Sequence, residues 1–155
     1  PQIKTFHKNF IILFSDNVSV EFYGNDTPEF HGSKQGRMYL TTHRMIFNSK
    51  SPAEPLRSFS FPFITLEDVA VEQPMFSANY IKGKIHAQPN GNFIGEVKFK
   101  IVFKSGGAIE FGQAINLFLY FPYQKEFCVQ LENYQLFFSL CGVAYIVFNQ
   151  AVISK

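Results

Sequence analysis

The chain has 155 residues, and its 14 Lys and Arg against 12 Asp and Glu give a formal net charge of +2. This length suits one domain with a substantial buried core. The near-neutral charge argues against a strongly basic nucleic-acid-binding protein, so we expect no direct sequence-specific binding to nucleic acid. The two cysteines, Cys128 and Cys141, are too few for a disulfide-rich secreted module.

The N-terminal region has patterns typical of β-strands. The apolar run 10–14 predicts a first strand, and Ser15, Asp16 and Asn17 supply the residues of a turn. Residues 18–22 alternate between apolar and polar side chains, which predicts a second strand with one buried face.

The next segments also predict strands. Residues 37–47 have apolar runs at both ends and a polar centre, which predicts a hairpin. Phe59, Phe61 and Phe63 stand two residues apart and therefore share one face of a strand. Pro62 lies on the opposite face and indicates a sheet edge or a strand end.

Residues 97–104 give the clearest strand pattern. One face of this strand is apolar and the other carries lysines; the apolar residues are Val97, Phe99, Ile101 and Phe103, and the lysines are Lys98, Lys100 and Lys104. A helix would scatter these lysines around its circumference, whereas a half-buried strand collects them on its solvent face. We expect this stripe to serve solubility and edge protection.

The pattern changes after Gly112, where residues 113–118 predict the start of a helix that Pro122 would limit. About seven antiparallel strands followed by one helix predict a mainly β fold, a small barrel with the helix capping one open end. This architecture is typical of pleckstrin-homology-like folds.

Composition divides the chain between residues 115 and 116. Residues 116–155 contain 25 hydrophobic residues among 40, and only four charged ones. We therefore predict one domain over 1–115 and an atypical apolar segment over 116–155, which would include the end of the capping helix. This segment has three interpretations: a transmembrane helix, an extra buried helix or strand pair, or a sequence that is not a native continuation. The abrupt loss of charge favours the third.

Residues for catalysis or metal binding are scattered. The four histidines, His7, His31, His43 and His86, have no metal-ligand spacing, and no glycine-rich stretch matches a phosphate-binding loop. We therefore expect a protein that is not an enzyme and has no catalytic residues, cofactor or metal ion.

Three segments carry a resemblance to a known family. Residues 36–47 look like the opening of a GRAM domain, a pleckstrin-homology-like module. Residues 73–83, with the sequence QPMFSANYIKG, and 106–113, with the sequence GGAIEFGQ, are more discriminating. Together they resemble the WW domain-binding protein 2 family over roughly residues 10–115.

The resemblance implies a non-catalytic adaptor that works by protein–protein docking in transcriptional coactivation and chromatin binding, in the nucleus and cytoplasm. Its family partners would be WW-domain proteins and the transcription machinery. Family members bind WW domains through Pro-Pro-x-Tyr motifs in a Pro-rich tail, which place a polyproline helix in an aromatic groove. This chain contains no such motif; Phe121-Pro122-Tyr123 is the nearest string. We therefore expect no WW-domain binding by the chain as written.

A second hypothesis is a phosphoinositide-binding adaptor at the membrane periphery. Barrels of this fold often hold anionic head groups with cations at one open end, and an ammonium or guanidinium group suits a phosphate. The candidate residues for an anionic-lipid or partner surface are Lys34, Arg37, Arg44, Lys82 and Lys84. The plainer reading is that they are ordinary solvated side chains.

Overall fold

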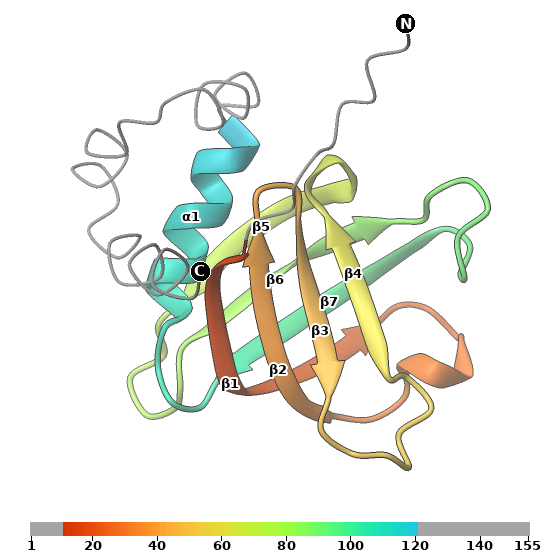
Figure 1. The fold of residues 1–155 in the computed structure, drawn as a ribbon, viewed down its shortest axis with the longest axis horizontal. Helices are drawn as coiled ribbons and strands as arrows, with labels where there is room; N and C mark the ends of the chain where they lie inside the picture. Colours follow the sequence, from red (N-terminus) through yellow and green to blue (C-terminus); the bar gives the residue numbers. More distant parts are fainter. Residues whose placement is uncertain (1–10, 121–155) are drawn as a thin grey trace, which may run out of the picture.

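The computed structural model describes residues 11–120, which form one curled antiparallel sheet and a C-terminal helix (Figure 1). The seven strands lie in the order β4-β3-β2-β1-β7-β6-β5. The strands are β1 (Ile11–Tyr23), β2 (Lys34–Thr41), β3 (Arg44–Ser49), β4 (Ser58–Pro62), β5 (Leu66–Glu72), β6 (Tyr80–His86) and β7 (Glu96–Phe103); the helix is α1 (Ala108–Tyr120), and two 3₁₀ turns are η1 (Pro28–Phe30) and η2 (Phe63–Thr65). The mainly β class predicted from the sequence, about seven antiparallel strands followed by one helix, is confirmed.

Strand β7 has the burial pattern that its sequence predicts. The side chains of Val97, Phe99, Ile101 and Phe103 lie in the core, and each is at most 2% exposed. Lys98 and Lys104 are exposed and Lys100 is half-buried. The period of two in the sequence therefore separates the core face from the solvent face.

Phenylalanines fill much of the barrel interior. At the end away from α1, the ring of Phe30 in η1 packs 4.7 Å from that of Phe22 and 5.4 Å from that of Phe93, centroid to centroid. Phe59 lies 4.8 Å from Phe61 in β4. Because β4 is an edge strand and ends at Pro62, the prediction of an edge or strand end there is confirmed.

Helix α1 lies beside β5 and η2 at one side of the sheet (Figure 1). Its inner face buries Phe111, Ala114, Ile115 and Phe118, which recur at helical spacing. The ring of Phe111 is 5.0 Å from that of Phe103 on β7. This face covers apolar side chains at the open side of the sheet, as expected for a capping helix.

The helix begins at Ala108, earlier than the sequence pattern suggested. Gly106 and Gly107 have φ values of 83° and 99°, so two left-handed residues reverse the chain directly from β7 into the helix. The expectation that the helix begins after Gly112 was wrong, since Gly112 lies within α1. The helix also continues beyond residue 115 to Tyr120, across the division drawn from composition.

The turn expected at Ser15–Asn17 is absent, and β1 is continuous from Ile11 to Tyr23. Its pairing with β2 shifts register between Ser15 and Val18, which marks an irregularity within the strand. The polar residues 15–17, which would also suit a turn, accommodate a bend within the strand. This bend lets one long strand follow the curled sheet.

The apolar segment predicted over 116–155 falls outside the described residues from position 121 onward, and so do its three interpretations. Among residues 11–120, no helix has both the length and the apolar character that crossing a membrane requires.

Candidate functional site

The loop between β5 and β6, residues 73–79, presents an apolar tip to solvent. Met75 is 90% exposed and Phe76 is 96% exposed. No residue of this loop is charged. The base of the loop is fixed, because the backbone N–H of Phe103 donates a 3.1 Å hydrogen bond to the carbonyl of Asn79. We call residues 73–79 the apolar loop.

Lys34, the first of the five cations proposed from the sequence, is buried. Its side chain is 1% exposed, and its Nζ lies 2.6 Å from Oε1 of Glu54. The same ammonium donates a 3.0 Å hydrogen bond to the carbonyl of His31. Lys34 therefore holds the start of β2 against the β3–β4 loop, and its charge is compensated inside the protein.

Three of the other cations form exposed ion pairs. Arg37 lies 2.6 Å from Asp16, Lys82 2.6 Å from Glu72, and Lys84 2.9 Å from Asp68. Hydrogen bonds with Glu72 and Asp68, together with their negative charge, raise the pKa of the Lys82 and Lys84 ammonium groups. A hydrogen bond with Tyr39 and the charge of Asp16 raise the pKa of the Arg37 guanidinium in the same direction.

Arg44 differs from the other four. Its Nη1 donates a 3.2 Å hydrogen bond to the Ser60 hydroxyl, while its buried Nε has no hydrogen-bond partner among the described residues. Lys34 and Arg44 begin β2 and β3, so they lie at opposite ends of the same hairpin. About seven residues of strand, roughly 23 Å, separate such ends. The five cations therefore do not gather into one cluster.

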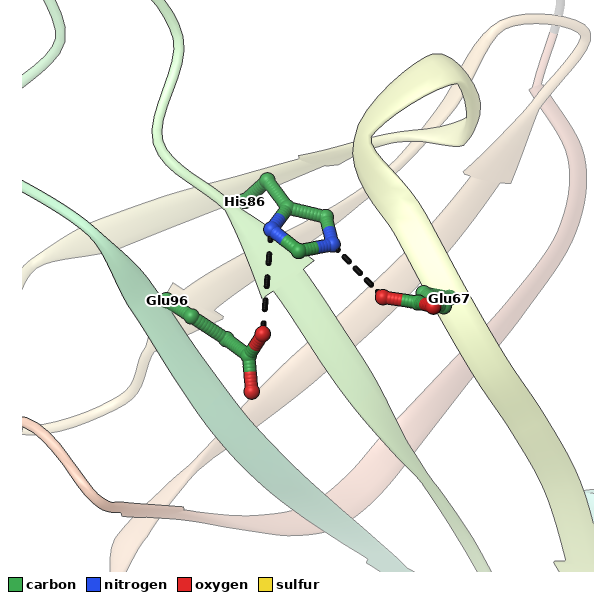
Figure 2. A group of neighbouring side chains, drawn as sticks. All are labelled: Glu67, His86 and Glu96. Atoms are coloured by element: carbon green, nitrogen blue, oxygen red, sulfur yellow. Dashed lines mark hydrogen bonds and ion pairs between the residues drawn. The ribbon is translucent and has the colours of Figure 1, made fainter.

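A second group of polar side chains lies on three neighbouring strands (Figure 2). Glu67 in β5, His86 in β6 and Glu96 in β7 project from the same face of the sheet. The imidazole Nε2 lies 2.7 Å from Oε2 of Glu67, and Nδ1 lies 3.8 Å from Oε2 of Glu96. Sequence spacing missed this group, because strand register brings together residues that are far apart in the chain.

The Glu67–His86–Glu96 group has ligand-type atoms within 4.8 Å of one another, which a divalent cation could bridge after modest side-chain movement. Each side chain is about half exposed, however, and His86 already shares a hydrogen bond with Glu67. Structural zinc sites are usually closed by four ligands. The geometry therefore fits a cross-strand polar network better than a metal centre.

The β6–β7 loop surrounds an open depression of about 520 Å³. Its lining residues are Ala87, Gln88, Pro89, Asn90, Gly91, Phe93, Ile94 and Gly95. None of these side chains titrates near neutral pH, so this depression offers no general acid or base.

The described elements coincide with a known domain family. The family model described as "GRAM domain" matches residues 4–121. The chain belongs to the GRAM domain family. WW domain-binding protein 2 of Homo sapiens is 43% identical over 105 residues, which are 66% of this chain and 40% of the relative. The postacrosomal sheath WW domain-binding protein of Homo sapiens is 44% identical over 102 residues, 64% of this chain and 33% of the relative.

This GRAM chain thus spans about two fifths or less of the length of these curated relatives. Among solved structures, the Vps36 N-terminal PH domain matches with a TM-score of 0.53 at 15% identity, over 73% of this chain and 80% of that chain. A chain of the 8S snRNP assembly intermediate matches with a TM-score of 0.51 at 10% identity, over 77% and 85%. At these identities the likeness establishes the fold alone, and it confirms the pleckstrin-homology-like class predicted from the sequence.

The family comparison confirms the resemblance inferred from residues 36–47, 73–83 and 106–113, and it supports a binding domain outside the known enzyme families. The exposure of Met75 and Phe76 was not anticipated, although both lie in the most discriminating of these segments. The one signal in the sequence that pointed to this exposure was the position of both residues in an uncharged loop.

Proposed function

We propose that this GRAM chain is the docking domain of an adaptor in transcriptional coactivation. The observation that carries the proposal is the similarity, over two thirds of the chain, to relatives whose names record binding to WW domains. By this proposal the barrel is a rigid frame that presents loops to partner proteins, and it performs no reaction. It would act in the nucleus and cytoplasm, in contact with chromatin-associated transcription machinery.

The relatives bear the name of WW-domain binding, but we do not propose that this chain binds WW domains. Such ligands need a preformed polyproline segment with a Tyr at fixed spacing. The 155 residues contain no Pro-Pro-x-Tyr, so a purified WW domain is expected to capture none of this chain. Partners of the described domain would instead contact its folded surface.

A reporter assay tests the coactivator proposal. The full chain, fused to a heterologous DNA-binding domain, is expected to raise transcription from a promoter that carries the matching sites. The DNA-binding domain alone is the control. Output equal to that control, from a fusion present at the same level and bound at the promoter, would contradict a role in coactivation.

A second candidate function is binding of a phosphoinositide head group at a membrane. One observation favours it: the Nε of Arg44 has no hydrogen-bond partner in residues 11–120, and because this atom is buried, it would donate to an anion only after the side chain moves. Against it, the ammonium or guanidinium groups of Lys34, Arg37, Lys82 and Lys84 already face carboxylates.

Sedimentation with vesicles separates the two candidates. The comparison uses phosphatidylcholine vesicles with and without a few per cent of a phosphoinositide, the wild-type chain, and the Arg37→Ala, Arg44→Ala double variant. Lys98→Ala is the matched control, because Lys98 is an exposed strand cation. Strong, salt-sensitive binding that only the double variant loses would favour the lipid candidate. The docking proposal expects little sedimentation in every case.

A further inference from the structure

The apolar loop exposes apolar side chains that take no part in the core of the domain. Single exposed apolar residues are ordinary, but Met75 and Phe76 are consecutive and almost fully exposed at the same tip. Met and aromatic residues are enriched in protein interfaces, where they fill pockets on the partner. The flanking residues Gln73, Pro74, Ser77, Ala78 and Asn79 carry no charge that burial would have to desolvate.

We propose that the apolar loop is the anchor by which this domain docks, with Phe76 and Met75 inserted together into an apolar pocket of a partner protein. This inference rests on the docking function proposed above and assigns it to particular residues. The partner is defined by its chemistry: a concave apolar pocket large enough for one aromatic ring and one thioether chain, with a rim that is polar but nearly neutral.

The loop is held for this role by the sheet beneath it. Asn79 accepts the hydrogen bond from Phe103 on β7, and Tyr80, the next residue, opens β6 in register with Val102. The Lys100 ammonium lies 4.6 Å from the centre of the Tyr80 ring. Because the ends of the loop are fixed by two neighbouring strands, less conformational entropy is lost on docking than for a free segment.

The charges around the loop favour a protein pocket over an anionic membrane. At its base, Lys82 is neutralised by Glu72 at 2.6 Å. Arg37 lies at the same end of the barrel and is paired with Asp16. Two lysines near the loop have no acidic partner among the described residues: the Lys104 ammonium donates a hydrogen bond to Gln35, and the Lys100 ammonium lies over the Tyr80 ring.

Stable attachment to a bilayer needs a second signal besides a small inserted apolar group, usually a polybasic patch. Two uncompensated lysines, one of them over an aromatic ring, do not make such a patch. A protein pocket needs no field of cations, because shape and apolar contact hold the inserted side chains. Because these two lysines leave only a small positive charge at this end of the barrel, a partner with a polar and nearly neutral rim suits it.

The test places a photo-crosslinking residue in the full chain in cells. p-Benzoylphenylalanine, an aromatic residue, replaces Phe76 in one sample and Ile94 in the other. Ile94 is the matched control, because it is 91% exposed and lies in the β6–β7 loop, at the opposite ends of β6 and β7. We expect a protein that crosslinks from position 76 and does not crosslink from position 94.

The crosslinked protein is then purified and titrated with three unlabelled chains: wild type, Phe76→Ser and Ile94→Ser. The expected result is a rise in Kd of about tenfold or more for Phe76→Ser, because a buried aromatic anchor is lost, and little change for Ile94→Ser. Thermal melts of the three chains should coincide, since both side chains are exposed.

Equal Kd values for all three chains would overturn the anchor while leaving the docking function intact. Absence of any crosslink from position 76 would overturn it too, and the reporter assay would then decide whether the docking function survives. A crosslink to a second copy of the chain would overturn the proposal and show that the loop mediates homodimerisation. Sedimentation with phosphatidylserine vesicles that is lost with Phe76→Ser would overturn it too and show that the loop binds a membrane.

Discussion

Gly112 in α1 lies directly against Val71 in β5. A Cβ atom built on residue 112 would be 2.0 Å from Cγ2 of Val71, a separation that real Cβ atoms do not tolerate. Only a residue without a side chain lets the helix backbone approach the edge strand this closely. This contact sets how α1 closes the open side of the sheet.

Gly112→Ala is therefore expected to destabilise the domain although Ala favours helices. Overpacking at a close contact costs about 1–3 kcal/mol, against a gain of roughly 1 kcal/mol in helix propensity. The measurement is the urea midpoint of unfolding. Gln113→Ala, an exposed position on the same helix, is the control and should shift the midpoint little. A more stable Gly112→Ala chain would show that the helix can move away from β5 at no cost.

The ion pair between Lys34 and Glu54 gives a second expectation. Glu54→Ala leaves the ammonium of Lys34, which is 1% exposed, without its carboxylate. Losing one partner of a buried pair costs about 3–5 kcal/mol. Because Glu54 is 21% exposed and Lys34 keeps the His31 carbonyl, we expect a loss nearer to about 2 kcal/mol in unfolding free energy.

Asp16→Ala is the matched control for Glu54→Ala, because it removes the carboxylate of an exposed pair with Arg37. Solvent screens such pairs, so the loss of stability should be much smaller. Equal losses in the two variants, measured by chemical denaturation, would show that burial of Lys34 does not set the strength of its pair.

Tyr23 provides an expectation about pH. Its hydroxyl donates a hydrogen bond to Glu21, and this bond, with burial and the carboxylate charge, raises the pKa of Tyr23 from 10.0 to about 12. The folded state thus holds the phenol proton more tightly than the unfolded state. The contribution of the protonated Tyr23 hydroxyl to folding stability is therefore complete below pH 10 and is lost as the pH rises toward 12.

Ultraviolet difference titration of the phenolate measures this pKa. In the Glu21→Gln chain the pKa of Tyr23 should return toward its ordinary range, because the hydrogen bond to the carboxylate and its negative charge are both lost. Tyr23→Phe identifies the signal by removing it. A titration curve that is the same with and without Glu21 would contradict the assignment.

The Glu67–His86–Glu96 group is expected to act as an exposed network. His86→Ala should change the unfolding free energy by less than about 1 kcal/mol, the usual range for solvent-exposed polar pairs. Micromolar zinc should shift the melting temperatures of the wild-type and His86→Ala chains equally. A zinc shift that appears only in the wild type would instead make this group a metal site.

Sequence periodicity was sufficient to predict the architecture because the sheet has one core face. The alternation in residues 97–104 predicts β7, and Pro62 predicts the end of the edge strand. The start of α1 was missed because Ala108–Phe111 suits either a strand or a helix. The helix begins at Ala108 because the two left-handed glycines before it reverse the chain. They act through backbone conformation, which leaves no periodic signal in the sequence.

The candidate site was less predictable for three physical reasons. Charge alone suggested that Lys34 belonged to a surface, yet a carboxylate twenty residues away compensates its burial. Met75 and Phe76 look like core residues in sequence, and only the direction of the β5–β6 loop exposes them. Strand register likewise brought Glu67, His86 and Glu96 together.

The most direct test of docking through the apolar loop compares two variants in the DNA-tethered reporter. Transcription driven by the Phe76→Ser fusion is divided by that driven by the Ile94→Ser fusion, at equal protein levels. We expect the Ile94→Ser fusion to match wild type and the Phe76→Ser fusion to fall to the level of the DNA-binding domain alone. A ratio near one, with both fusions as active as wild type, would contradict the claim that this domain docks its partners through Phe76.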